Sequence, residues 1–285
     1  EFIKRIAPDG LEFLKFGKAD TDFISILFCD IRSFTSLSEK MSPQELVDFL
    51  NDFFKRMTEP ISNNKGFVDK FIGDGVMALF SIPEEPNAAD ALNSVMAAIS
   101  MQQQIDSFNK DNKMAEEKRL RIGIGIHSGP VIIGTVGSEE RMESTVTGDT
   151  VNLASRLEGL TKFYRSKILI SQSTYEFIDS ESSFEFRELD LVKVKGKDKP
   201  VTIFEVCNSD PEPIREQKLG SREKFAEALK DYRSQKWTAA MTKFKNCLKE
   251  CPDDGASELH LERCKSFKKT PPPKDWKGEQ VFTQK

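Results

Sequence analysis

The stretch Ile24–Thr35, ISILFCDIRSFT, is the part of the chain from which the rest can be interpreted. Ile24–Cys29 form a short, mostly apolar run with the length of a buried β-strand. The run ends at Asp30, and Ser33 then offers a hydroxyl that suits the N-cap of a helix. A carboxylate beside the amides that open a helix suits a metal ion and a polyphosphate together. By itself, an acidic residue at this point is more often an ordinary turn residue.

The bulk composition of the 285 residues, 38% hydrophobic and 31% charged, is typical of soluble proteins. A net charge of −4 provides no basic footprint, so we expect no nucleic-acid partner. Apolar runs stay well below the ~20 residues that span a bilayer, and no signal-peptide pattern is present. Five scattered cysteines, an odd number, favour reduced thiols over a disulfide framework. These features predict a cytoplasmic location.

Residues 1–20 carry scattered apolar side chains that Pro8 and Gly10 interrupt. Because the chain begins at Glu1 rather than at Met, we interpret this segment as a connector from an upstream sensor or membrane module of a longer protein. A segment that simply covers the main domain is the alternative.

Strand and helix patterns alternate from residue 21 to residue 207. Ser42–Glu45 predict a capping box for a helix that extends to about Ile61. Gly73–Gly75 predict a hairpin turn between two strands. The other expected elements are strands 67–71, 76–80, 120–126, 131–136, 167–171, 184–194 and 201–206, helices 88–108 and 150–157, and a turn at 127–130. This alternation predicts a mixed α/β layer with helices packed on a sheet.

Residues 208–285 are more polar and helical, and Pro211 and Pro213 mark their beginning. The apolar residues of this extension resemble one tetratricopeptide-like helix pair, although the spacing departs from that repeat, and a Pro-rich tail follows from Pro271. A single pair cannot bury its own apolar face, so we expect it to pack on the main domain or on another chain.

The extension also holds four soft metal ligands, Cys247, Cys251, His260 and Cys264. Zinc could accept such a set. The two pairs are spaced at i,i+4 within helical patterns, however, and buried free cysteines are common in proteins. We therefore favour free thiols over a zinc site.

Asp74, within the predicted hairpin turn, supplies a second carboxylate between two apolar strands. If its strands neighbour the one that ends at Asp30, the two acids meet and repel each other unless a cation neutralises them. Hard oxygen ligands suit Mg²⁺ or Mn²⁺, and two such ions can clamp the attacking and leaving oxygens of a phosphoryl displacement. An Asp-Gly turn that needs no function is the alternative.

Five segments follow one another along the chain. They are FCDIRSFT (28–35), DKFIGDGVMALF (69–80), GIGIHSGPVIIG (123–134), ESTVTGDTVNLASRLE (143–158) and VKVKGK (192–197). Together they closely resemble the class III nucleotidyl cyclase catalytic domain. The resemblance covers about residues 20–207 and implies the cyclase-type fold, a ferredoxin-like mixed β-sheet with flanking helices, to which residues 208–285 add a small helical extension.

The resemblance also implies a role for each matching residue. The metal ligands are Asp30, Asp74 and the carbonyl of Ile31, around two Mg²⁺ or Mn²⁺ ions per site. The remaining roles are phosphate binding by the amides of Phe34 and Thr35, purine selection by Lys70 and Thr145, ribose orientation and transition-state stabilisation by Asn152 and Arg156, and triphosphate binding by Lys195, with Lys197 as an equally good match.

Elementary chemistry is consistent with several of these roles. Asn152 and Arg156 are four residues apart and share one face of a helix, although such pairs usually form a solvated edge. The planar guanidinium of Arg156 suits charge spread over phosphate oxygens. A lysine at position 70 can donate to N1 of adenine, and Thr145 can accept from its 6-amino group, so ATP is the expected substrate. No histidine is needed, and we expect a structural role for His127.

The implied activity is that of an adenylate cyclase, which forms 3′,5′-cyclic AMP and pyrophosphate when the ribose 3′-hydroxyl attacks the α-phosphate. By resemblance, the sites lie at the interface of a homodimer, where one chain gives Asp30 and Asp74 and its partner gives the purine and ribose residues. Threonine at position 145 resembles a bicarbonate-responsive subgroup. The alternatives are a guanylate cyclase and a catalytically silent cyclase-like module that regulates by binding.

Overall fold

The computed structural model describes residues 19–81, 87–138, 141–178, 183–194 and 199–282. Most of the predicted N-terminal connector and the segment with Lys195 and Lys197 lie outside these residues. The chain forms two compact units. The first unit comprises Glu1–Ile122, Ile126–Ser155 and Ser173–Ser180, and the second comprises Gly123–Gly125, Arg156–Gln172 and Glu181–Lys285.

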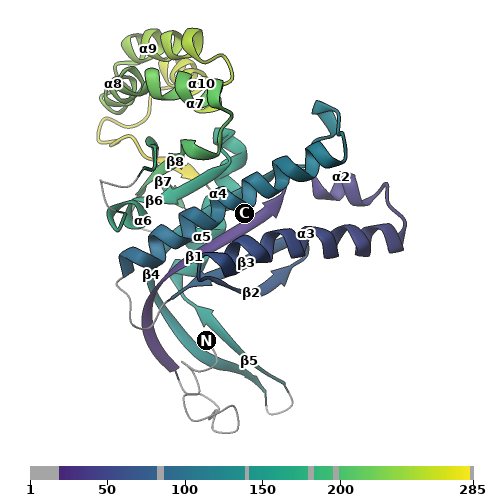
Figure 1. The fold of residues 1–285 in the computed structure, drawn as a ribbon. Helices are drawn as coiled ribbons and strands as arrows, with labels where there is room; N and C mark the ends of the chain where they lie inside the picture. The colour runs from purple at the N-terminus through teal and green to yellow at the C-terminus, as the bar shows by residue number, and fades with distance from the viewer. Residues whose placement is uncertain (1–18, 82–86, 139–140, 179–182, 195–198, 283–285) are drawn as a thin grey trace. The chain divides into compact units, whose positions relative to one another are not determined.

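The first unit is a sheet covered by two long helices (Figure 1). Its strands are β1 (Ala19–Ile31), β2 (Phe67–Ile72), β3 (Gly75–Phe80), β4 (Ile122–Ser138) and β5 (Arg141–Thr147), and its long helices are α3 (Pro43–Asn63) and α4 (Asn87–Asp111). The strand order is β2-β3-β1-β4, β3 is antiparallel to both β1 and β2, and β5 pairs with β4. This order, with α3 and α4 as the connections, is the ferredoxin-like split βαβ arrangement. The predicted mixed sheet with flanking helices is therefore confirmed.

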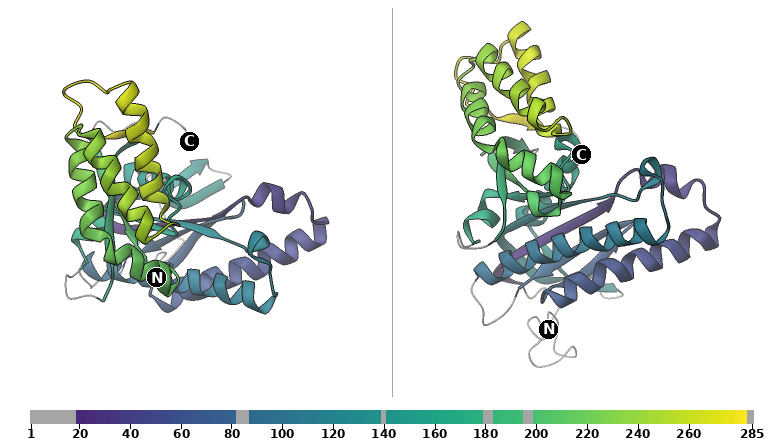
Figure 2. Two further views of the ribbon diagram at one scale, coloured as in Figure 1. Left: turned by 90° about the horizontal axis from the view of Figure 1, so that it is seen from above. Right: turned by 45° about the horizontal axis from the view of Figure 1, so that its top comes forward.

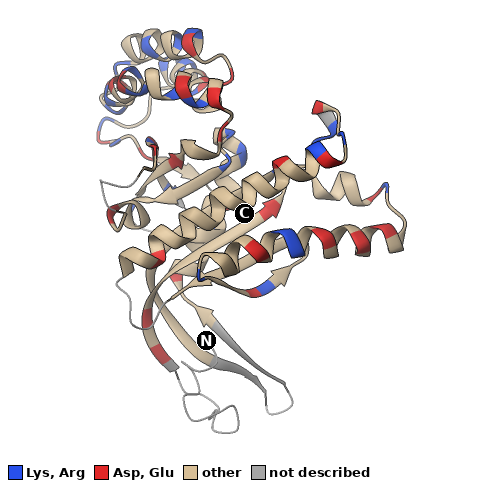
Figure 3. Cartoon of the chain, viewed as in Figure 1, with Lys and Arg blue, Asp and Glu red and all other residues tan. Residues whose placement is uncertain are grey.

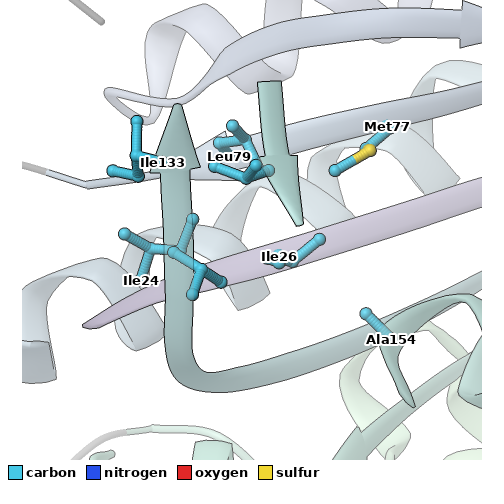
Figure 4. Close-up of a cluster of buried hydrophobic side chains, with 8 residues drawn as sticks. Ile24, Ile26, Met77, Leu79, Ile133 and Ala154 are labelled. Atoms are coloured by element: carbon cyan, nitrogen blue, oxygen red, sulfur yellow. The ribbon is translucent and has the colours of Figure 1, made fainter. Parts of the chain in front are cut away.

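The core of this unit lies where β1, β3 and β4 meet. Figure 4 shows Ile24 and Ile26 of β1 near Met77 and Leu79 of β3 and Ile133 of β4. All of these side chains are at most 7% exposed. Every residue of β3 is buried, as expected for a strand with neighbours on both edges. A rigid sheet thus supports the polar residues at the strand ends.

The sequence predicts a side-chain N-cap at both Ser42 and Ser33, and the structure contains only one of the two. Ser42 forms the predicted capping box of α3, in which its hydroxyl accepts from the Glu45 amide and the Glu45 carboxylate accepts from the Ser42 amide. Ser33 does occupy the N-cap position of α2 (Phe34–Ser38), but its backbone is left-handed, with φ of 57°, and its hydroxyl makes no capping bond. The predicted side-chain cap at Ser33 is therefore wrong.

The predicted turn at residues 127–130 is also wrong, because β4 continues through it as one strand of 17 residues. The polar groups of this segment form hydrogen bonds with residues of neighbouring elements. The Ser128 hydroxyl is 2.7 Å from that of Ser25 on β1 and donates to Thr174 at 3.1 Å. The Pro130 carbonyl accepts from the Thr150 hydroxyl at 2.5 Å. The chain reverses later, between β4 and β5.

The second unit combines four strands of the nine-stranded sheet with the C-terminal helices (Figure 2). Its strands are β6 (Ile168–Ser171), β7 (Phe186–Val194), β8 (Val201–Val206) and β9 (Gln280–Phe282), in the order β6-β8-β7-β9. The pairs β6–β8 and β7–β8 are antiparallel, whereas β9 runs parallel to β7. Helix α5 (Asp149–Tyr164) begins in the first unit and continues into the second from Arg156. The short helix α6 spans Gln172–Glu176.

The extension contains more helices than the single pair predicted. They are α7 (Glu212–Gly220), α8 (Arg222–Arg233), α9 (Trp237–Glu250) and α10 (Gly255–Lys269). Helix α9 packs against both α8 and α10, so the apolar face that the sequence left without a partner is covered by α10. The described helices include none that is long and apolar enough to cross a membrane.

Candidate active site

The end of β1 and the turn between β2 and β3 bring two acidic residues together. Cys29 of β1 pairs with Val76 of β3, so Asp30 and Ile31 lie beside the two-residue turn that holds Asp74. The Ile31 amide donates to Asp74 Oδ2 at 3.3 Å. Figure 3 shows red, acidic segments at both ends of β1. We call Asp30, Ile31 and Asp74 the acidic corner.

Gly75 allows this close approach of the two strands. A Cβ atom at this position would lie 3.2 Å from the Cys29 carbonyl oxygen and 3.5 Å from Asp30 Oδ1. It would also lie 3.1 Å from the Ile72 carbonyl oxygen. Contacts near 3 Å to backbone oxygens leave little space for a side chain, so the glycine keeps the Asp30 carboxylate next to the turn.

The donor set of the acidic corner fits a hard divalent cation. Both carboxylates are only half-buried, and Asp74 forms no ion pair with any described residue. Two carboxylates and a nearby main-chain carbonyl are the oxygen ligands that Mg²⁺ and Mn²⁺ accept. Among the described residues no group of three or more His, Cys, Asp or Glu side chains is arranged to hold a metal. Further ligands would therefore come from a substrate or from water.

Lys70 lies on β2, the edge strand of the first unit, next to a bulge. The pairing with β3 shifts between Val68 and Lys70, which places the nearly buried Asp69 in the bulge. The Lys70 ammonium is 3.4 Å from Asp69 Oδ2 and is about one-third exposed. The following residues, Phe71 and Ile72, are 49% and 53% exposed, so this strand presents an apolar surface beside the lysine.

The other predicted site residues are distributed as follows. Phe34 and Thr35 open α2 directly after the acidic corner. Thr145 lies on β5 opposite Gly134, and its side chain is outside the description. Asn152 and Arg156 are one turn apart on α5, with Asn152 exposed and Arg156 half-buried. The structure thus brings together Asp30, Ile31 and Asp74 within the first unit.

A second cluster of charges, which the sequence did not indicate, lies in the second unit. Arg187 of β7 donates to Glu205 at 2.5 Å and to both carboxylate oxygens of Asp254 at 2.7 and 2.8 Å. Lys218 donates to Glu205 at 3.0 Å and to Asp210 at 2.7 Å. Burial opposes ionisation of Asp254, but Arg187 outweighs it and lowers the pKa of that carboxyl to about 2. We call these five residues the buried ion cluster.

The cysteines and the histidine of the extension are buried side chains that do not converge on a metal position among the described residues. Burial lowers the pKa of His260 to about 4, so its ring is neutral near pH 7 and bonds the Leu189 carbonyl at 2.9 Å. Burial also raises the pKa of the Cys247 thiol to about 11 and that of Cys264 to about 12. Thiols with such a pKa are poor nucleophiles near pH 7.

Comparison with known proteins adds to this geometry. The family described as "Adenylate and Guanylate cyclase catalytic domain" matches residues 17–206. The chain is 48% identical to an adenylate cyclase of Anabaena cylindrica over 211 residues, which are 72% of this chain and 41% of that protein. It is 39% identical over 265 residues to "Adenylate cyclase, terminal-differentiation specific" of Dictyostelium discoideum, which covers 93% of this chain and 12% of that protein.

A solved structure is also similar. The adenylyl cyclase CyaB from P. aeruginosa superposes with a TM-score of 0.60 and 33% identity, over 66% of this chain and 95% of that one. The chain spans less than half the length of the two relatives above. The similarity to the Dictyostelium protein extends beyond residue 206 and therefore includes part of the helical extension.

Proposed function

The chain belongs to the family of adenylate and guanylate cyclase catalytic domains, and from this premise we propose that it converts ATP into 3′,5′-cyclic AMP and pyrophosphate. The observation that carries the proposal is the acidic corner, where a short turn and the end of β1 place Asp30 beside Asp74. Relatives named adenylate cyclase at 48% and 39% identity support the choice of product.

The acidic corner would hold two divalent cations, Mg²⁺ or Mn²⁺, through the two carboxylates and the Ile31 carbonyl. Bound there, the ions would lower the pKa of the ribose 3′-hydroxyl and neutralise the departing pyrophosphate. The half-burial of Asp30 and Asp74 leaves their oxygens accessible for this purpose. Because Asp74 is held by the Ile31 amide, the turn and the strand would present their ligands in a fixed relation.

Substrate choice would depend on Lys70 and Thr145. The lysine donates to adenine N1, and the threonine oxygen accepts from the 6-amino group. Guanine presents the reverse pattern of donor and acceptor, and a mispaired polar group in a closed pocket costs several kcal/mol. The family name includes guanylate cyclases, so GTP is the competing substrate.

Catalysis would use Asn152 to orient the ribose and Arg156 to stabilise the charge that develops on the transferred phosphate. Lys195 or Lys197 would bind the triphosphate together with the amides of Phe34 and Thr35. These residues would act across a homodimer, in which each chain supplies Asp30 and Asp74 to one site and Lys70, Thr145, Asn152 and Arg156 to the other. The exposed Phe71 and Ile72 next to Lys70 support a covered surface there.

The proposal also covers how the enzyme is regulated and where it acts in the cell. Threonine at position 145 suggests a response to bicarbonate, and the short coverage of the relatives suggests an upstream sensor or membrane module in a longer chain. Catalysis would take place in the cytoplasm, where ATP is available.

The decisive experiment is product analysis with ATP and GTP side by side, in Mg²⁺ and in Mn²⁺, with and without bicarbonate. Cyclic AMP as the dominant product supports the proposal, and cyclic GMP would replace it with the guanylate alternative. Nucleotide binding without any cyclic product would identify a silent regulatory module.

A separate experiment tests whether two chains share each active site. Mixing Asp30→Ala chains with Arg156→Ala chains should restore one complete site per heterodimer. If the mixture stays as inactive as either variant, sites shared between chains are refuted.

A further inference from the structure

The end of helix α5 is held by the C-terminal extension. Gly255, the first residue of α10, lies against Arg165, where an added Cβ atom would come within 2.5 Å of the Arg165 Cβ. Arg165 also forms an ion pair with Glu258 of α10 at 2.6 Å. Phe163 and Tyr164 both contact the ring of Phe282 in β9, with centroid distances of 5.3 and 6.4 Å.

A buried polar centre lies under these contacts. The Tyr164 hydroxyl donates to Asp190 Oδ2 of β7 at 2.6 Å, and Arg263 of α10 donates to the same oxygen at 2.5 Å. Tyr164 and Asp190 are at most 1% exposed. Burial and the Asp190 charge raise the pKa of Tyr164, so its hydroxyl keeps its proton and remains a donor.

The same arginine joins the last strand to this centre. The Arg263 guanidinium lies 5.5 Å from the ring of Tyr164 and 5.7 Å from that of Phe282. Strand β9, which contains Phe282, pairs in parallel with the last residues of β7. Helix α5, strand β7, helix α10 and strand β9 are therefore joined through four residues, Tyr164, Asp190, Arg263 and Phe282, which we call the clasp.

Tyr164 of the clasp lies on the same helix, α5, as Arg156, the residue assigned to transition-state stabilisation. Arg156 is eight residues before Tyr164, which is about 12 Å along an α-helix. A helix moves as a unit, so a shift at its clasped end is transmitted to Arg156. A misplacement of about 1 Å in a catalytic group can lower the rate about 100-fold.

We propose that the C-terminal extension is a positioning element of the cyclase, in which Arg263 fixes α5 through Asp190 and Tyr164 and thereby places Arg156. The inference rests on the proposed function. The similarity to the Dictyostelium adenylate cyclase, which continues into the extension, supports a role for these helices. The superposition with CyaB covers only 66% of this chain.

The test uses the full chain and a double-mutant cycle between Arg263→Ala and Arg156→Ala. If Arg263 acts through Arg156, Arg263→Ala lowers kcat about 10- to 100-fold with KM for ATP within about twofold, and Arg263→Lys recovers part of the loss. In the Arg156→Ala background the same substitution has little further effect. A merely structural role lowers the folded fraction, so the loss is equal in both backgrounds and overturns the proposal.

Two further variants keep the test informative if Arg263→Ala folds poorly. Tyr164→Phe removes only the hydroxyl that donates to Asp190 and should lower kcat about 3- to 10-fold. Lys243→Ala breaks a more exposed ion pair with Glu227 and Asp231 in the same extension and should leave kcat unchanged. An unchanged kcat in folded Tyr164→Phe and Arg263→Lys chains refutes the proposal.

A readout independent of activity separates the two proposals. Hydrogen exchange of the α5 amides should accelerate in Arg263→Ala and in Tyr164→Phe but not in Lys243→Ala. If the wild-type chain forms no cyclic nucleotide, the proposed function fails, whereas accelerated exchange still demonstrates the mechanical link. Unchanged exchange in a fully active enzyme refutes the link alone.

Discussion

The acidic corner and the buried ion cluster differ in how their charged side chains are arranged. In the corner, Asp30 and Asp74 approach each other half-exposed at the end of a strand, and Asp74 receives one amide within the described part of the chain. In the cluster, Arg187 is 1% exposed and forms ion pairs with two carboxylates, those of Glu205 and Asp254. Lys218 forms ion pairs with Glu205 and Asp210. One region gathers like charge, and the other pairs opposite charges.

This difference separates charges that serve stability from charges that serve a ligand. A buried charge must be paired, because removal of one partner leaves the other in a low-dielectric interior at a cost of about 3–5 kcal/mol. Two carboxylates close together at a strand end repel each other and suit a bound cation. Substitutions in the corner should therefore change activity, and substitutions in the cluster should change stability.

The largest effect is expected at the acidic corner. Asp30→Ala and Asp74→Ala should each lower cyclic AMP formation at least ~1,000-fold, because a metal ligand supplies several kcal/mol of transition-state stabilisation. Thermal unfolding should change far less than activity, since both carboxylates are only half-buried. Asp48→Ala, on the exposed face of α3, is the matched control. A near-normal rate in either variant with Mg²⁺ or Mn²⁺ would refute the metal assignment.

The second effect concerns the buried ion cluster. Arg187→Leu leaves the Glu205 and Asp254 carboxylates buried without their main cation, and we expect a loss of about 3–5 kcal/mol in the free energy of unfolding. Urea denaturation measures this loss. Lys243→Ala, which breaks a more exposed ion pair, should cost far less, because surface ion pairs contribute little to stability. Equal costs for the two variants would remove the distinction between paired buried charge and surface charge.

The third prediction follows from the neutral ring of His260, which is fully buried in the second unit. Its pKa in the folded chain is about 4, against an ordinary value of 6.5, so the unfolded chain binds more protons between these values. Stability is therefore complete above pH 6.5 and decreases as the pH falls toward 4, by about 3 kcal/mol in total. His260→Gln keeps a donor for the Leu189 carbonyl but does not titrate, so its stability should vary less over this range. Parallel pH profiles for the two proteins would contradict the prediction.

The sequence predicted what depends on neighbours along the chain. The capping box at Ser42 and the hairpin turn that holds Asp74 need only a few adjacent residues, and both are present in the structure. That Asp74 meets Ile31 depends on the register between β1 and β3, whose paired residues are 47 to 55 positions apart. Local patterns carry no information on such a register.

The errors have the same cause. The segment 127–130 contains glycine, proline and serine and resembles a turn, but hydroxyls from Ser25 and Thr174 satisfy Ser128 within a strand. The sequence did not indicate the role of Arg187, because its partner Asp254 lies 67 positions later in the extension. In both cases the deciding contacts come from residues distant in the sequence.

The smallest effect is expected at the hydroxyl groups of Ser25 and Ser128 in the first unit, a buried pair without charge. Ser25→Ala removes a buried hydrogen bond of 2.7 Å to Ser128 and should cost about 1 kcal/mol of stability with cyclic AMP formation unchanged. The double variant Ser25→Ala with Ser128→Ala should cost less than the two single variants together, because no hydroxyl of the pair remains unsatisfied. Ser62→Ala, at an exposed position of α3, is the control. A loss as large as that of Arg187→Leu would mean that neutral and charged pairs support the fold equally, and strictly additive costs would mean that the two hydroxyls do not interact.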